Sequence, residues 1–131
     1  MKPEILIIDD EWAVSRAIAA RLEASGFTTR VAAGGEEGLA AVEAAHPDAV
    51  VLDLRMPDID GLEVLRRLRS DPRHAQVPVI MVTANVQDSV RGEAMALGAK
   101  AFFGKPYDQQ ALVAALRRVT TPEPCGEGAN P

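Results

Sequence analysis

Ile5-Leu6-Ile7-Ile8-Asp9-Asp10 is an apolar run that ends in two carboxylates, and related patterns return twice along the chain. Val50-Val51-Leu52 ends at Asp53, and Phe102-Phe103 is followed shortly by Lys105-Pro106. The first two runs are rich in Val and Ile and do not alternate with polar residues, which is typical of parallel strands buried on both faces. Because the carboxyl ends of such strands form a ligand crevice, we expect these charged residues to converge on one small site.

Helical patterns separate the apolar runs, so the sequence predicts repeated βα units. The first helix carries Val14, Ala17, Ile18 and Leu22 on one stripe and ends at Gly26. The expected class is α/β, a doubly wound five-stranded parallel sheet in (βα)5 order. Strands are predicted near 4–8, 28–32, up to Asp53, 79–82 and 101–103, and helices near 11–25, 36–45, from Leu62 to Leu68 and beyond, 87–97 and 108–119.

Length and composition indicate one domain. The chain has 131 residues, of which 47% are hydrophobic and 25% charged, with a net charge of −5. We expect a single domain over 1–119 and a flexible tail or linker over 120–131, which is rich in Pro, Gly and Glu. The acidic balance predicts no direct nucleic-acid binding, and the absence of long apolar runs predicts no membrane contact and a cytoplasmic location. Cys125, the one cysteine, cannot form an internal disulfide.

The acidic residues need a cation if they share one crevice. Three neighbouring carboxylates, Asp9, Asp10 and Asp53, repel one another, and burying their charge without compensation costs several kcal/mol. Ligation by oxygen atoms alone favours Mg²⁺, with Mn²⁺ as a substitute. Asp53 could then act as a nucleophile that forms an acyl phosphate. Thr83 would offer a hydroxyl to a phosphoryl oxygen, and Lys105 would pair with Asp53 and then with phosphate.

Several motifs in this order resemble the receiver domain of two-component response regulators, over about residues 3–119. They are Asp9-Asp10, Asp53-Leu54-Arg55-Met56-Pro57 with Gly61, Thr83-Ala84, and Gly98-Ala99 leading to Lys105-Pro106. The resemblance implies the flavodoxin-like (βα)5 receiver fold. It also implies phosphorelay signalling: a histidine kinase or phosphotransfer protein donates a phosphoryl group, and a conformational change controls an unknown downstream output protein or domain. Such a domain is not an enzyme, although it assists its own phosphorylation and dephosphorylation.

The resemblance also implies a role for each site residue. Asp53 would be the phosphoacceptor, Asp9 and Asp10 metal ligands together with Asp53 and the backbone carbonyl of Arg55, and Thr83, Ala84 and Lys105 the phosphoryl-binding residues. Thr83 and Phe102 would form the switch, Arg55 and Asn85 would tune hydrolysis, and the peptide bond before Pro106 would be cis.

The sequence departs from the family pattern at two places, and these departures concern dimerisation and the switch. The last helix has alanines at 111 and 115, where regulators that dimerise through their fourth and fifth helices usually carry an acid and an arginine, so that mode of dimerisation is not expected. The switch position holds Phe102 rather than tyrosine, so switching would depend on packing alone.

Two other functional classes share parts of this pattern. A Mg²⁺-dependent aspartyl-phosphate phosphatase of the dehalogenase-like type would use a second aspartate where this chain has Arg55. A flavodoxin-like electron carrier would need a Ser/Thr-rich phosphate loop where this chain has Asp9-Asp10. His46 and His74 lie in predicted loops and are expected to be solvated.

Overall fold

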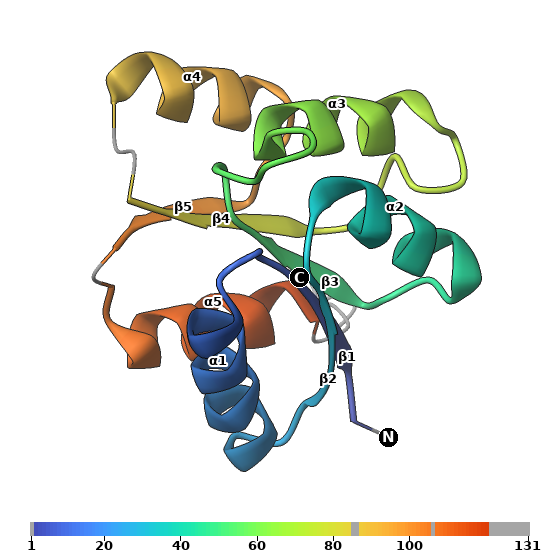
Figure 1. Cartoon of the computed structure of the whole chain (residues 1–131). Coiled ribbons are helices and arrows are strands. Elements are labelled where there is room, and N and C mark those ends of the chain that lie inside the picture. The colour runs from blue at the N-terminus through green and yellow to red at the C-terminus, as the bar shows by residue number, and fades with distance from the viewer. Residues whose placement is uncertain (1, 85–86, 106, 121–131) are drawn as a thin grey trace, which may run out of the picture.

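The computed structural model describes residues 2–84, 87–105 and 107–120. Within them, strands and helices alternate along the chain as predicted (Figure 1), and the observed bounds differ from the expected ones by about one residue. The strands are β1 Glu4–Ile8, β2 Thr28–Ala32, β3 Ala49–Leu52, β4 Val79–Thr83 and β5 Ala101–Gly104. The helices are α1 Trp12–Ala24, α2 Gly35–Ala44, α3 Gly61–Ser70, α4 Asp88–Ala96 and α5 Gln109–Thr120.

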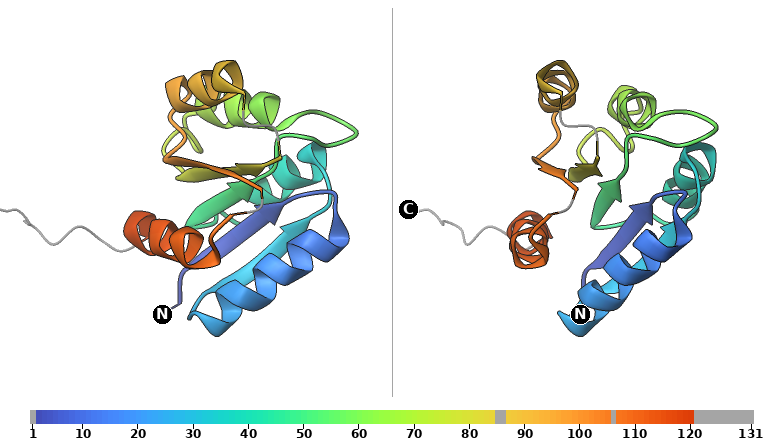
Figure 2. Two further views of the ribbon diagram at one scale, coloured as in Figure 1. Left: turned by 90° about the vertical axis from the view of Figure 1, so that its left-hand side faces the viewer. Right: turned by 60° about the vertical axis from the view of Figure 1, so that its left-hand side comes forward.

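All strands pair in parallel in one sheet, in the order β2-β1-β3-β4-β5. Helices α1 and α5 cover one face of the sheet, and α2, α3 and α4 cover the other (Figures 1 and 2). This is the flavodoxin-like (βα)5 arrangement that the sequence predicts. The order of connection changes between β1 and β3, which places the ligand crevice at the carboxyl ends of these two strands.

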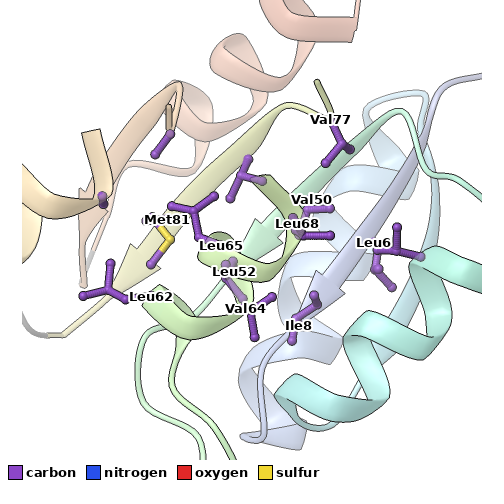
Figure 3. Close-up of a cluster of buried hydrophobic side chains, with 14 of the residues drawn as sticks. Leu6, Ile8, Val50, Leu52, Leu62, Val64, Leu65, Leu68, Val77 and Met81 are labelled. Carbon is purple, nitrogen blue, oxygen red and sulfur yellow. The ribbon is translucent and has the colours of Figure 1, made fainter. Parts of the chain in front are cut away.

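Each face of the sheet has its own apolar core. Leu6, Ile8 and Leu52 point toward α2 and α3, whereas Ile7 and Val51 point toward α1 and α5. Figure 3 shows the leucines of α3 packed against the side chains of β1, β3 and β4. The interior strands are buried on both sides, which explains their unbroken apolar sequences.

The helix ends follow local chemistry, but α4 is held weakly. The Asp60 carboxylate caps α3 by accepting the Glu63 N–H at 2.9 Å. Gly98, which follows α4, has a φ of +87°, a conformation that favours glycine. In α4 itself only Ala94 is buried, and a Cβ built on Gly92 meets no atom within 4 Å. This helix therefore has the least packing to resist movement.

In the part of the chain that the structure describes, every helix is too short or too polar to cross a bilayer.

Candidate functional site

The ends of β1 and β3 bring the predicted carboxylates together. Ile8 and Leu52 are partners in the parallel register, so Asp9 and Asp53 follow directly from adjacent strands. The Asp53 N–H donates to the Ile8 carbonyl at 3.0 Å. Carboxylate oxygens of Asp9, Asp10 and Asp53 all lie within 4.8 Å of one another. The expected convergence of these three residues is therefore present in the fold.

Asp53 is a buried carboxylate whose protonation is set by its neighbours. Its side chain is 6% exposed, and its Oδ1 accepts the Leu54 N–H at 2.9 Å. Burial, and then the charge of Asp9, raises the pKa of Asp53 to about 6, although Lys105 and the hydrogen bonds from Leu54 and Thr83 oppose the rise. The site therefore disfavours the ionised carboxylate until further positive charge arrives.

Lys105 places a positive charge beside these carboxylates. Its backbone N–H donates to the Thr83 carbonyl at 2.8 Å, which fixes the residue beside the end of β4. Its Nζ lies 3.3 Å from Asp9 Oδ2, 3.4 Å from Glu11 Oε1 and 3.9 Å from Asp53 Oδ1. Burial lowers the pKa of Lys105, but Asp53 and Asp9 outweigh it and hold the pKa above its ordinary value. By these distances, the ammonium group lies closer to the carboxylates of Asp9 and Glu11 than to that of Asp53.

A close backbone approach explains the glycine at the start of α3. A Cβ on Gly61 would lie 2.3 Å from the Asp53 carbonyl oxygen, so only glycine fits. The Gly61 N–H also donates to the Leu54 carbonyl at 2.8 Å. These contacts fold the loop after β3 back on itself and fix the backbone around Asp53.

The remaining site residues line an open pocket of about 850 Å³. Thr83 is fully buried at its floor, and Arg55 and Ala84 are exposed at its mouth. Asn85 and Pro106 lie outside the described residues, so their roles in hydrolysis and as a cis peptide remain predictions.

The acidic cluster fits a hard divalent cation such as Mg²⁺. Three carboxylates from two adjacent strand ends supply oxygen ligands, and the open pocket leaves room for the waters that Mg²⁺ retains. The raised pKa of Asp53 has Asp9 as its second cause, so an added cation would relieve a repulsion that the structure already contains.

Phe102 lies on the same side of the sheet as α4. It is half-buried against the cluster that includes Met81 and Val90. The Arg91 guanidinium of α4 lies over its ring at 5.2 Å, a distance typical of cation–π contacts.

The sequence reasoning missed Glu11 and Arg91. Glu11 follows the Asp9-Asp10 pair directly, and this run of three acidic residues is a signal that could have identified it. Arg91 carries no comparable signal, because its contact depends on how α4 packs on β5.

A second polar cluster lies away from this pocket and corrects one expectation. His74 was expected to be solvated, but it is 7% exposed, and its Nε2 lies 3.1 Å from Glu43 Oε2. The Arg73 guanidinium pairs with both Glu43 and Asp71, at 2.6 and 2.7 Å. Because Arg73 pairs with both carboxylates, the cluster forms an ion-pair network that joins α2 to the loop after α3.

Curated relatives with similar sequences are bacterial and algal regulators. The chain is 39% identical over 117 residues to the DNA-binding dual master transcriptional regulator RpaA of Synechocystis sp., covering 88% of this chain and 48% of that protein. It is 37% identical to the response regulator MprA of Mycolicibacterium vanbaalenii, covering 98% of this chain and 57% of MprA. The chain thus spans about half the length of the curated relatives it matches.

These relatives contradict the expectation of no direct nucleic-acid binding. RpaA is named as DNA-binding, and a further relative, 35% identical, is the phosphate regulon transcriptional regulatory protein PhoB of Rhizobium meliloti. The expectation rested on a net charge of −5, which describes 131 residues, whereas these proteins are about twice as long. The charge of this chain therefore does not decide whether nucleic acid is among the protein's partners, and that prediction was wrong.

Solved structures and a family model agree on the fold. A putative response regulator from Chloroflexus aurantiacus superposes with a TM-score of 0.87 at 30% identity, covering 93% of this chain and all of that one. The chemotaxis protein CheY4 of Vibrio cholerae gives a TM-score of 0.84 at 27% identity, covering 91% of this chain and 99% of CheY4. The model of the response regulator receiver domain matches residues 5–117. The chain therefore belongs to the receiver-domain family of the response regulators of two-component systems.

Proposed function

We propose that the chain accepts a phosphoryl group on Asp53 from a histidine kinase or a histidine phosphotransfer protein, with Mg²⁺ bound, and that it relays this as a change of conformation. Receiver domains act in phosphorelay signalling rather than as classical enzymes. The observation that carries the proposal is the convergence on Asp53 of an acidic pair, a lysine and a buried threonine.

In the proposed phosphoryl transfer, Asp53 is the nucleophile. A carboxylate oxygen of Asp53 forms the new bond to phosphorus, while the bond from phosphorus to the donor's nitrogen or oxygen breaks and its electron pair leaves with the donor. Thr83 and Lys105, which already interact with Asp53, would contact the phosphoryl oxygens. Asp9, Asp10, Asp53 and the Arg55 carbonyl would hold the Mg²⁺, which offsets the repulsion between these carboxylates and the incoming anion.

The output of the signal is also a proposal. Since RpaA and PhoB are named as regulators of transcription, we infer that phosphorylation of this chain controls transcription. The domain bounds at 1–119 and 120–131, the cytoplasmic location and the roles of the individual site residues belong to the same proposal. The phosphatase alternative is not favoured, because Arg55 stands where that family prefers a second aspartate.

Labelling by a small phosphodonor tests the proposal. The protein is incubated with acetyl phosphate or phosphoramidate, with and without Mg²⁺, and its intact mass is measured. We expect one added phosphoryl group that depends on Mg²⁺ and is lost in Asp53→Asn.

Asp48→Asn is the matched control, because Asp48 directly precedes β3, at the end opposite to Asp53. Its carboxylate accepts the Glu4 N–H at 2.7 Å, a hydrogen bond that asparagine can also accept. This variant should be labelled like the wild type. Equal labelling of Asp53→Asn and the wild type would refute the assignment.

A further inference from the structure

Glu11 lines the same pocket as Asp53, but the function proposed above gives it no role. It occupies the N-cap position of α1 without making a side-chain cap hydrogen bond. Its carboxylate instead lies 3.4 Å from Lys105 Nζ, and its side chain is 61% exposed. The side chain is thus directed to the lysine rather than to the start of its own helix.

Asp9 connects Glu11 to Lys105 through both of its carboxylate oxygens. Oδ1 accepts the Glu11 N–H at 2.9 Å, and Oδ2 lies 3.3 Å from Lys105 Nζ. The turn between β1 and α1 therefore presents two carboxylates, those of Asp9 and Glu11, to one ammonium group. Asp53 is the most distant of the three carboxylates around it, at 3.9 Å.

We propose that Glu11 is a positioning residue that holds the Lys105 ammonium on the Asp9 side of the pocket before phosphorylation and so slows phosphoryl transfer to Asp53. The inference rests on the proposed function. Glu11 and a phosphoryl group on Asp53 would compete for the same ammonium group, which lies 3.4 Å from Glu11 Oε1 and 3.9 Å from Asp53 Oδ1.

The size of the effect follows from the exposure of the pair. An ion pair with one partner in solvent changes an equilibrium or a rate by up to about five-fold, because water screens it. Replacing Glu11 with glutamine, which keeps the size of the side chain and removes its charge, should therefore raise the labelling rate about two- to five-fold. The increase should shrink as the salt concentration rises.

The experiment measures initial rates of labelling by acetyl phosphate for the wild type, Glu11→Gln and Glu37→Gln, each at a Mg²⁺ concentration that saturates that variant. Saturation is read from the fluorescence of Trp12, the single tryptophan, which adjoins Glu11. Glu37→Gln removes the same charge from the first turn of α2, outside the residues that line the pocket, and should behave like the wild type.

A double-mutant cycle separates the contact from a general effect of charge or structure. Lys105→Gln alone should slow labelling, and adding Glu11→Gln to it should then produce no acceleration. In the unphosphorylated protein, the NMR resonance of the Lys105 Cε should move in Glu11→Gln and stay in place in Glu37→Gln.

Failure of the inference and failure of the proposed function give different results. If Asp53→Asn is labelled like the wild type, the proposed function fails. If Asp53 is the labelled residue but Glu11→Gln is no faster than the wild type, or is still faster in the Lys105→Gln background, Glu11 does not act by positioning Lys105.

Discussion

Replacing Asp53 with asparagine should stabilise the fold at neutral pH when no divalent cation is present. Burial and the charge of Asp9 raise the pKa of Asp53 from 3.8 to about 6. Between these two values the folded protein binds more protons at this site than the unfolded chain does, so the free energy of unfolding falls as the pH rises from about 4 to 6. Asparagine keeps the acceptor for the Leu54 N–H and carries no charge.

The magnitude follows from the shift of the pKa. A difference of about two units corresponds to about 3 kcal/mol, at 1.36 kcal/mol for each unit. Because the pocket is open to water, we expect the free energy of unfolding of Asp53→Asn to exceed that of the wild type by only about 1–2 kcal/mol at pH 7. At pH 4 the two proteins should be almost equally stable. Mg²⁺ at about 100 times its Kd should add about 2.7 kcal/mol to the wild type, and much less to Asp53→Asn, which has lost a ligand.

Urea unfolding followed by circular dichroism, in a chelator at several pH values between 4 and 7.5, measures both effects. The lowered pKa values of Asp58 and Asp71, at about 2, change the stability mainly below about pH 5, and they do so equally in both proteins. If the stability difference between the two proteins does not change with pH, then the pKa of Asp53 is not raised by its surroundings.

Three further predictions concern α4, α1 and the lifetime of the phosphorylated state. Gly92→Ala should raise the free energy of unfolding by about 0.5–1 kcal/mol, because a Cβ there meets no atom within 4 Å; unchanged stability in urea unfolding would contradict it. Ala20→Glu, on the exposed side of α1, should slow transfer from the cognate histidine donor and leave labelling by acetyl phosphate unchanged, whereas equal loss of both would argue against docking on α1. Arg55→Asn combined with Asn85→Glu should shorten the lifetime of the phosphorylated state, timed after the donor is removed, because neither native side chain can act as a general base; an unchanged lifetime would show that these positions do not control hydrolysis.

The sequence predicted the fold well because the controlling signal is local. A strand buried on both faces must be apolar throughout, and its first polar residue marks its carboxyl end. Asp9 and Asp53 could therefore be placed at strand ends without any knowledge of tertiary contacts. Their approach then followed from the parallel register of β1 and β3.

Contacts set by the packing of one element on another could not be predicted in this way. His74, in the loop after α3, is buried where this loop packs against α2 and contacts Glu43. No local sequence pattern indicates this contact. Asp58 is a second example: its carboxylate accepts the N–H groups of Gly35 and Glu36 at 3.0 and 2.8 Å and so caps α2 from a distant loop. In both cases the decisive partner lies more than 20 residues away.

The loosely packed α4 connects these observations to signalling. Its contacts with the rest of the fold include the Arg91–Phe102 contact and an ion pair between Glu93 and Arg66 of α3. An exposed ion pair adds little to stability, so α4 is among the elements that the protein can move at small cost. Phe102 has no hydroxyl with which to hydrogen-bond a surface loop, and Arg91 lies directly over its ring. We propose that a change in the position of Phe102 on phosphorylation would break its contact with Arg91, and that the predicted switch acts on α4 through this pair of side chains.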